Sequence, residues 1–314
     1  MSVILEAKHI SKNFGLTQAL KDVSVTIDEG EVIGLIGENG SGKSTLSSII
    51  SGVYPQSEGE LTLDGKPYKP ADTLDAQNHG ISMIAQEMGT LPGIKVADNL
   101  FIGKEQLFTK HGVVDRKKMY QEARKALEKI GIDNIHPEDP IIKYSLEERK
   151  LIEVVRALYT NPRIFIVDET TTALSQRGRD IIYQVIKNMK KENKTVLFIS
   201  HDLEELMEVC SKLIVLRDGV FVAELEKSEF EEEKIKELMV GRKLTGDYYR
   251  SDYDGSYGKE VVLSAEKLYV GDSLKGVSLE LHKGEILGIG GLTDCGMHEL
   301  GKRCLEMLNR CMVK

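Results

Sequence analysis

One stretch of this chain occurs twice, and the repeat is the feature that most limits which fold the chain can adopt. Residues 20–44 and residues 274–298 align without a gap, and both contain an apolar segment followed by a glycine-rich loop. Each loop has a glycine, four residues and a second glycine, but the Lys43-Ser44 pair that follows the first loop is absent after the second. The repeat therefore predicts two strand–loop–helix units, of which one is intact.

The intact loop has the composition of a phosphate-binding loop. Backbone N–H groups in a glycine-rich turn, placed between a buried strand and a helix N-terminus, bind anions. In this motif the lysine reaches the β- and γ-phosphates of a nucleotide, and the serine hydroxyl holds Mg²⁺. A turn that only caps a helix is the alternative. The predicted nucleotide-binding residues of the loop are Gly37, Glu38, Asn39, Gly40, Ser41, Gly42, Lys43, Ser44 and Thr45.

The second loop, from Gly291 to Gly296, is degenerate. Met297 stands where the lysine would be and carries no charge. His298 stands in place of the serine and is a poor ligand for Mg²⁺, which prefers hard oxygen ligands. We expect this loop to hold a nucleotide loosely at most, without hydrolysing it.

An apolar strand at 164–167 is followed by two carboxylates, Asp168 and Glu169. In a P-loop protein the first of these is the Mg²⁺ partner, and the second is positioned to polarise the attacking water. Strands often end in acidic turns, so the pair becomes informative only because a phosphate-binding loop precedes it.

Two further apolar strands end in polar residues. His201 follows the strand at 196–199 and would add a donor toward a γ-phosphate, although a lone histidine is more often structural. Gln86 follows the strand at 81–84 and would join the shell of Mg²⁺ and water.

Composition narrows the class of protein. A chain of 314 residues predicts about two domains. A net charge of −8 argues against nucleic acid as the main partner, because nucleic-acid binding usually needs a basic face. The sequence has no run of about 20 apolar residues, the length that a membrane-spanning helix needs. Its four cysteines lack disulfide or zinc spacing, which favours a reducing compartment.

The order of patterns predicts an α/β fold. Residues 1–84 are β-rich, residues 90–160 are helical, and strands alternate with a helix at 176–191, as in a parallel sheet. Asp115 is expected to cap a helix with one apolar face formed by Met119, Ala123, Ala126, Leu127 and Ile130.

We expect three segments along the chain. The first is a nucleotide-binding domain over 1–245, with its helical subdomain at about 90–160. A linker at 246–260 is rich in Tyr, Asp, Ser and Gly, and 261–314 forms an incomplete second domain with the degenerate loop. The acidic stretch at 229–237 is expected to be a solvated helix face.

Together these motifs resemble the ATP-binding subunit of an ABC transporter. More narrowly, the chain is similar to the two-domain ATPases of bacterial importers of ribose, galactose and xylose, which also carry a lysine-less loop in their C-terminal half. The strings that carry the resemblance lie at 37–46, 51–54, 86–87, 96–103, 152–158 and 199–205.

The resemblance implies a P-loop ABC ATPase domain with a parallel sheet core, an N-terminal antiparallel β subdomain and a helical insertion. It also implies that ATP hydrolysis with Mg²⁺ powers monosaccharide import at the cytoplasmic face of the membrane. The implied partners are transmembrane permease subunits and an extracytoplasmic sugar-binding protein, with no nucleic acid; these partners choose the sugar. Phe14 is implied as an adenine-stacking aromatic, with a place in the core as the alternative.

The chain departs from this family at its signature helix, which reads Ser145-Leu146-Glu147-Glu148-Arg149 where the sugar importers have Ser-Ile-Gly-Gln. In the family this helix start faces the γ-phosphate bound by the opposite domain. A glutamate there would cost about 4 kcal/mol at ~4 Å and an effective dielectric near 20. A Ser-x-x-Glu capping box is the second interpretation, compatible with the first. Thr170 replaces a usual proline, which is expected to loosen the loop after Glu169.

The last departure is that the chain reaches only Lys314, so the partial second domain is expected to pack on the first domain or on another chain that supplies the rest of it. A natural truncation, a split gene and an incomplete reading frame are the alternatives for this end. In the head-to-tail pairing of the family, the degenerate loop would face the degenerate signature, leaving one hydrolytic and one inert site. The alternatives are a degenerate fragment that binds ATP without efficient hydrolysis and, less favoured, a soluble ABC protein acting on ribosomes or DNA. A P-loop kinase or GTPase is disfavoured because no guanine-reading Asn-Lys-x-Asp string is present.

Overall fold

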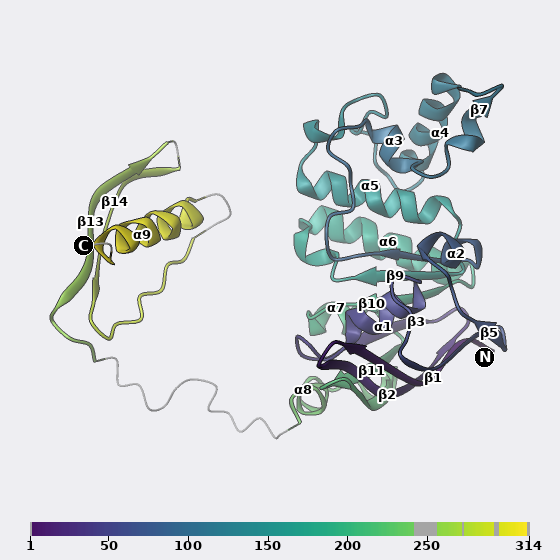
Figure 1. Ribbon diagram of the computed structural model, residues 1–314, viewed down its shortest axis with the longest axis horizontal. Helices are drawn as coiled ribbons and strands as arrows, with labels where there is room; N and C mark the ends of the chain where they lie inside the picture. The colour runs from purple at the N-terminus through teal and green to yellow at the C-terminus, as the bar shows by residue number, and fades with distance from the viewer. Residues whose placement is uncertain (1, 242–255, 272, 292–294, 313–314) are drawn as a thin grey trace. The chain divides into compact units, whose positions relative to one another are not determined.

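The chain forms two compact units, residues 1–244 and 245–314 (Figure 1). The computed structural model describes residues 2–241, 256–271, 273–291 and 295–312. Most of the predicted linker, 246–260, lies outside the described residues.

The first unit is built on a six-stranded sheet with the order β12-β11-β3-β10-β9-β6. All neighbouring strands are parallel except β11 and β12, which are antiparallel. The strands are β3 (Val32–Ile36), β6 (Ile81–Ile84), β9 (Ile164–Asp168), β10 (Thr195–Ile199), β11 (Lys212–Arg217) and β12 (Val220–Glu226).

A four-stranded antiparallel sheet has the order β2-β1-β4-β5, and a short hairpin, β7–β8, lies within the helical segment. The strands are β1 (Val3–Phe14), β2 (Thr17–Asp28), β4 (Glu58–Leu63), β5 (Lys66–Tyr68), β7 (Thr109–Lys110) and β8 (Val113–Val114). The α-helices are α1 (Lys43–Ile50), α2 (Thr73–Asn78), α3 (Val96–Leu100), α4 (Arg116–Glu128), α5 (Leu146–Tyr159), α6 (Gln176–Lys191), α7 (Leu203–Val209) and α8 (Glu232–Val240). The 3₁₀ helices are η1 (Glu105–Phe108), η2 (Ile141–Lys143), η3 (Thr171–Ala173) and η4 (Lys227–Glu229).

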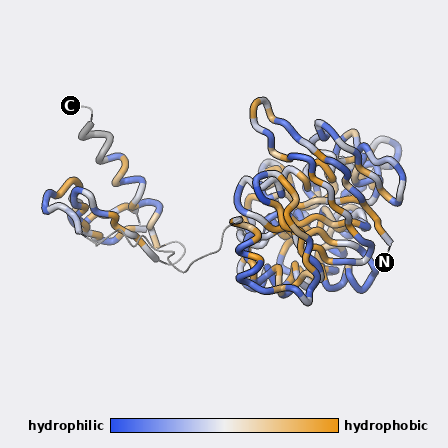
Figure 2. The backbone as a smooth tube through the Cα atoms, turned by 90° about the horizontal axis from the view of Figure 1, so that it is seen from below, coloured by the Kyte–Doolittle hydropathy of each residue, from blue (hydrophilic) through white to orange (hydrophobic). Residues whose placement is uncertain are grey.

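The central sheet is covered on both faces, which explains why its strands are continuously apolar. Along β9, Phe165 and Val167 pack in the core formed with α3 to α6, whereas Ile164 and Ile166 pack in the core shared with α1 and the antiparallel sheet. Apolar residues accordingly concentrate along the inner segments of this unit (Figure 2). The predicted fold class is confirmed.

Local signals in the sequence match the helices they predicted. Helix α6 has the predicted bounds, and Asp115 caps α4 by accepting a bond from the Lys118 backbone N–H at 3.0 Å. On the predicted apolar face of α4, Met119, Ala123 and Leu127 are fully buried. The β7–β8 hairpin was not predicted, because strands of two residues carry no periodic pattern.

The second unit repeats only the opening of the first. Its elements are β13 (Val261–Val270), β14 (Leu274–His282) and α9 (Met297–Met312). The segment 286–290, which aligns with β3, forms no strand, and its Ile286 side chain is 72% exposed whereas the aligned Val32 is 1% exposed. In the first unit, β10 and β11 flank β3, but among the described residues of the second unit β13 and β14 pair only with each other.

Burial predicts a large difference between two thiols. Cys210 is buried, which raises the pKa of its thiol to about 12, whereas Cys295 is exposed. At neutral pH the Cys210 thiolate is thus ~10³-fold rarer than that of an ordinary cysteine. We expect maleimide to label Cys295 in the folded chain and Cys210 only after denaturation, as measured by peptide mass spectrometry. Equal labelling rates would contradict the burial.

Candidate nucleotide-binding site

The glycines of the first loop are required by its close packing. Gly42 caps α1 with φ +99°, and a Cβ there would lie 2.5 Å from Leu20 Cδ2 and 2.8 Å from the Ala19 carbonyl oxygen. A side chain is disfavoured at such a φ and has no room at this position. The loop therefore keeps its backbone close to β2 and delivers α1 directly after β3.

Lys43 and Ser41 are polar groups of the loop that suit a phosphate. Lys43 is buried, and its Nζ donates to the carbonyls of Gly37 at 2.8 Å and Glu38 at 3.0 Å. Burial lowers the pKa of Lys43, while Glu169 and Asp168 partly raise it. The Ser41 hydroxyl is buried and has no hydrogen-bond partner among the described residues. A buried donor without a partner calls for a ligand, so the loop fits an anion.

Asp168 lies beside the start of α1 and fits a Mg²⁺ site. Its carboxylate accepts bonds from the Ser44 hydroxyl at 3.3 Å and the Ser47 hydroxyl at 3.4 Å. The side chain is 2% exposed, and burial raises its pKa. Hydroxyl and carboxylate oxygens are the hard ligands that Mg²⁺ prefers, so Ser44 and Asp168 are the residues that would hold it. The sequence did not predict the contact of Ser47 with Asp168, because it arises only when one turn of α1 places the Ser47 hydroxyl beside that carboxylate.

Glu169 has an unusual backbone conformation at the end of β9. Its φ is +43°, which is uncommon for a residue with a side chain and is typical of functional sites. The backbone N–H donates to Ile199 in β10 at 2.9 Å, and the side-chain Oε2 accepts a bond from Gln86 Nε2 at 2.9 Å. Gln86, predicted beside Mg²⁺, thus contacts the carboxylate predicted to activate water.

The ends of four parallel strands bring the predicted residues to one edge of the sheet. Val167 pairs with Ile84, and Ile199 pairs with both Asp168 and Leu35. Gln86, Glu169 and the phosphate-binding loop follow directly after these positions, as does His201, whose side chain is exposed.

Phe14 lies at the end of β1 and is 42% exposed, so the alternative that it belongs to the core is wrong. Its ring stands edge-on to Tyr54 with centroids 5.4 Å apart, and Lys12 Nζ lies 5.0 Å from the ring centroid. The neighbouring Asn13 is exposed as well, so the end of β1 lies at the surface. A stacking role for the exposed ring remains a prediction.

The degenerate signature forms a capping box at the start of α5. The Glu148 backbone N–H donates to the Ser145 hydroxyl, and the Ser145 backbone N–H donates to the Glu148 carboxylate. Glu147 instead accepts a bond from Ser175, the cap of α6, at 2.5 Å. The side chains of Leu146 and Arg149 diverge: Leu146 is 65% exposed, while Arg149 bonds to the carbonyls of Ile142 and Tyr144.

A buried carboxylate that sequence reasoning missed connects the site to α7. Glu205 is 7% exposed and accepts bonds from the hydroxyls of Thr171 at 2.8 Å, Ser200 at 2.9 Å and Tyr183 at 2.6 Å. It therefore ties the loop after Glu169 to the segment that carries His201. The sequence shows only an acidic residue in the first turn of a helix, and such a residue is usually exposed to solvent.

Threonine hydroxyls hold the loop in which the usual proline is missing. Thr170 has φ −72°, a value that proline also adopts, and its hydroxyl bonds the Asp168 carbonyl at 3.2 Å. Thr172 bonds the Glu169 carbonyl at 2.9 Å. These bonds, with that of Thr171, hold the loop in the absence of the proline, and its expected loosening remains a prediction.

The degenerate loop keeps the glycine contact of the intact one. Gly296 has φ +91°, and a Cβ there would lie 2.6 Å from the Ser273 carbonyl oxygen and 2.8 Å from Leu274 Cδ2. Ser273 and Leu274 align with Ala19 and Leu20, so the second loop approaches its strand as the first does. Residues 292–294 lie outside the described residues. The loss is thus in the Met297 and His298 side chains, while the glycine turn is kept.

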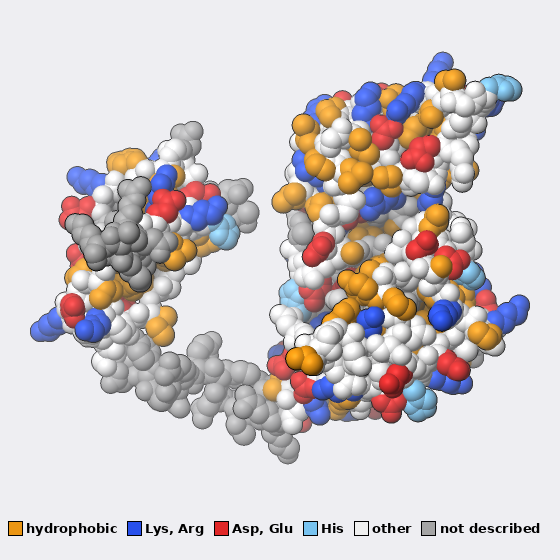
Figure 3. Space-filling model, in the orientation of Figure 1, with side chains coloured by type: hydrophobic (Ala, Val, Ile, Leu, Met, Phe, Trp, Pro, Cys, Tyr) orange, Lys and Arg blue, Asp and Glu red, His pale blue; other side chains and the backbone are white. Residues whose placement is uncertain are grey.

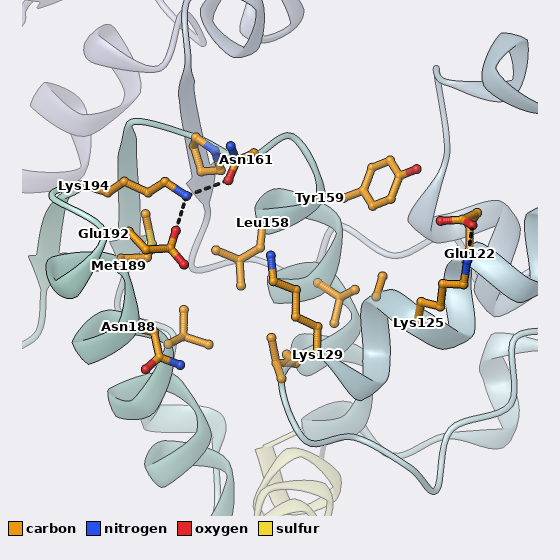
Figure 4. Close-up of a pocket in the computed structure, with 15 residues that line it drawn as sticks. Glu122, Lys125, Lys129, Leu158, Tyr159, Asn161, Asn188, Met189, Glu192 and Lys194 are labelled. Atoms are coloured by element: carbon orange, nitrogen blue, oxygen red, sulfur yellow. Dashed lines mark hydrogen bonds and ion pairs between the residues drawn. The ribbon is translucent and has the colours of Figure 1, made fainter.

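A cavity of about 350 Å³ lies between α4, α5 and α6 (Figure 4) and shares no residue with the phosphate-binding loop. Two of its rim lysines are paired, Lys125 with Glu122 at 2.8 Å and Lys194 with Glu192 at 2.6 Å. The paired carboxylates neutralise these two lysines.

Comparison with known proteins decides the class of this domain. Residues 20–172 match the family model described as ABC transporter. A nucleotide-free ATP-binding cassette from an ABC transporter is 27% identical with a TM-score of 0.64, covering 76% of this chain and 96% of that one. The ADP conformation of the cassette MJ1267 is 27% identical with a TM-score of 0.65, covering 77% of this chain and 100% of that one. The chain contains an ABC-type ATPase domain.

Curated relatives are similar to this chain beyond that domain. The ribose import ATP-binding protein RbsA of Caldanaerobacter subterraneus subsp. tengcongensis is 38% identical over 304 residues, which cover 96% of this chain and 60% of the relative. That of Shouchella clausii is 39% identical over 298 residues, covering 95% and 59%. The chain therefore spans about 60% of the length of these relatives. Among its described residues, no helix has the length and apolar character for crossing a membrane.

The buried Asp168 carboxylate is expected to lower the free energy of unfolding of the first unit at neutral pH. Because burial raises its pKa, ionisation is harder in the folded than in the unfolded chain, and stability falls as pH rises through the ordinary carboxyl range. Asp168→Asn should therefore stabilise the first unit by about 1 kcal/mol at pH 7, with no gain at pH 3. Thermal unfolding at both values tests this sign; a lower melting temperature at pH 7 would contradict it.

Proposed function

We propose that this chain binds ATP with Mg²⁺ and hydrolyses it to power monosaccharide import through a membrane permease. The observation that carries the proposal is the meeting of a phosphate-binding loop, the Ser44–Asp168 pair and Glu169 at one sheet edge. The relatives named for ribose import support the transport role.

In the proposed reaction, ATP is the substrate. Water attacks its γ-phosphorus, the bond from that phosphorus to the bridging oxygen of the β-phosphate breaks, and ADP and phosphate are released. Lys43, which now donates to the Gly37 and Glu38 carbonyls, would turn its ammonium to the phosphate oxygens. The Glu169 carboxylate would orient the water and accept its proton, held in place by the Gln86 amide. Mg²⁺, when bound by Ser44 and Asp168, supplies charge neutralisation on the phosphates.

The two defects of the chain support a proposal of one active and one inert site in the assembly. Met297 and His298 remove the charged and hydroxyl groups of the second loop, and Glu147 occupies the signature. If domains pair head to tail, both defects belong to the same composite site. The active site would then use the intact loop, Glu169 and His201 with a signature that lies outside residues 1–314.

Exposed apolar residues support the proposed partners. Met88 and Leu91, in the segment that follows Gln86, are 38% and 48% exposed and would contact a permease at the cytoplasmic face of the membrane.

In the second unit, Ile286, Leu287 and Ile289 are exposed although the aligned residues of β3 are buried. We propose that further strands of a complete second nucleotide-binding domain cover them. An extracytoplasmic sugar-binding protein would deliver the sugar. On the face in Figure 3, acidic and basic side chains of the first unit are interspersed, without a broad basic patch.

Fractionation and turnover test this function together. We expect the chain to co-sediment with membranes through a polytopic permease, and to hydrolyse ATP faster in that assembly than as the purified chain. Double substitution of Met88 and Leu91 by Asp should release it from the membrane without changing ATP affinity. Rapid turnover by the purified chain, abolished by Glu169→Gln, would contradict the need for an external signature.

The second candidate function is ATP binding without efficient hydrolysis, which the degenerate signature favours. Glu147 lies where glycine would let a phosphate approach. Single-turnover measurements on the membrane assembly separate the two: bound ATP that is exchanged intact supports the second candidate, and release of ADP and phosphate supports the first.

A further inference from the structure

Helix α5 carries two charged residues in the interior of the first unit, Lys150 and Glu153. Their side chains are 2% and 3% exposed. Lysine and glutamate are almost never fully buried unless they are paired, because desolvating a charge is costly. Neither side chain takes part in the capping box or bonds a side chain of the nucleotide site, so their burial needs another explanation.

Lys150 is directed at the backbone that follows β6. Its Nζ lies 2.9 Å from the Ala85 carbonyl oxygen, 3.3 Å from that of Gln86 and 3.1 Å from that of Glu87. Glu153 Oε2 lies 3.0 Å from the same nitrogen. An ammonium has three donors and no acceptor, so this group is saturated by three consecutive carbonyls and one carboxylate.

Glu153 and Arg156 hold the far end of the same segment. The second oxygen of Glu153, Oε1, accepts a short bond from the Gly89 backbone N–H. Arg156 Nη1 donates to the Gly89 carbonyl oxygen at 3.1 Å. Residues 85–89 are therefore attached to one face of α5 at both ends.

This segment contains Gln86, whose side chain contacts the residue proposed to activate water. Gln86 Nε2 donates to Glu169 Oε2 at 2.9 Å. A continuous path thus leads from Lys150 to the Gln86 backbone, through the Gln86 amide, to the Glu169 carboxylate. Helix α5 begins at the signature segment, so the same helix supports both features.

We propose that Lys150, neutralised by Glu153, is a positioning residue that fixes Gln86 against Glu169 and so makes hydrolysis depend on the placement of α5. The inference rests on the proposed ATPase function. A cation with several donors satisfies three carbonyls that no neutral apolar side chain of this length would satisfy. The pair therefore specifies one conformation of the segment 85–89.

Hydrogen exchange of the Gly89 amide in the full chain reports the attachment without any nucleotide. Lys150→Met keeps the length of the side chain and removes all three carbonyl bonds. We expect the Gly89 amide to exchange at least about tenfold faster, while amides of β3 and β10 keep their rates. Lys143→Met is the matched control, because Lys143 is 58% exposed and paired with Asp139 at the surface. It should change none of these rates.

Turnover separates positioning from a merely structural role. In the membrane assembly we expect Lys150→Met to lower kcat about tenfold or more, while the affinity for ATP changes less than about twofold. Lys150→Arg, which keeps the cation and its donors, should recover part of both the exchange protection and the kcat.

The double variant Lys150→Met/Glu153→Met covers the case in which Lys150→Met alone fails to fold. It removes the unpaired buried carboxylate together with the lysine, which restores folding in comparable buried pairs. Its Gly89 amide should still exchange fast and its kcat should still be low.

Gly89 exchange at the wild-type rate in a folded Lys150 variant would overturn the inference, as would fast exchange with an unchanged kcat. A wild-type assembly that does not hydrolyse ATP would overturn the proposed function instead. An active wild type with an equally active Lys150→Met overturns the inference alone.

Discussion

Glu169→Gln is expected to lower ATP turnover by about 10²–10⁴-fold while leaving ATP affinity nearly unchanged. Glutamine has the shape of glutamate and still accepts a bond from Gln86 Nε2 through its own oxygen, so the local structure is kept. It cannot accept a proton from water. Lys43 and the Ser44–Asp168 pair, which would hold the phosphates and Mg²⁺, are untouched. The loss should therefore appear in kcat and not in binding.

Steady-state turnover of the membrane assembly, together with equilibrium binding of a fluorescent ATP analogue, measures this prediction. Glu204→Gln is the matched control, because Glu204 is an exposed glutamate at the start of α7. It should keep both parameters. Turnover within about twofold of wild type in Glu169→Gln would show that another group accepts the proton.

Glu205→Ala is expected to lower the free energy of unfolding of the first unit by about 1.5–3 kcal/mol, the range for a buried hydrogen bond to a charged group. Three hydroxyls, from Thr171, Ser200 and Tyr183, would lose their acceptor. A buried donor without a partner costs about 1–3 kcal/mol, and the three are not additive because they share one acceptor. The loop after Glu169 should lose its anchor.

Urea denaturation followed by circular dichroism measures this loss of stability, with Glu204→Ala on the same helix as the control. That variant should change the midpoint little, since surface substitutions usually stay within about 0.5 kcal/mol. A Glu205→Ala chain as stable as the control would mean that water replaces the carboxylate. It would contradict the prediction that the three hydroxyls depend on Glu205 as their acceptor.

Local patterns account for the parts of the site that were predicted correctly. The apolar strand with Asp168 and the glycine-rich loop with Lys43 are each a short contiguous stretch of sequence. Their chemistry can therefore be predicted without knowledge of the fold. Parallel strands then carry these residues to a common edge by register.

Lys150 and Glu205 could not be predicted in the same way. In sequence they are ordinary charged positions on helices, and charged helix positions are normally solvated. Their partners, Glu87 and Thr171 among them, lie in segments that only packing brings near. The same holds for Phe14, whose exposure depends on which face of β1 is covered.

The sequence by itself determined that one phosphate-binding loop keeps its lysine and serine and that the other has lost them. That conclusion needs only the identity of adjacent residues. The tertiary structure decided that Gly296 still makes the turn of Gly42, while in the described part of the second unit no strand flanks the segment 286–290 as β10 and β11 flank β3. It also decided that α5 holds Gln86 through Lys150. Burial and pairing between distant segments are properties of the packed chain, and no local pattern encodes them.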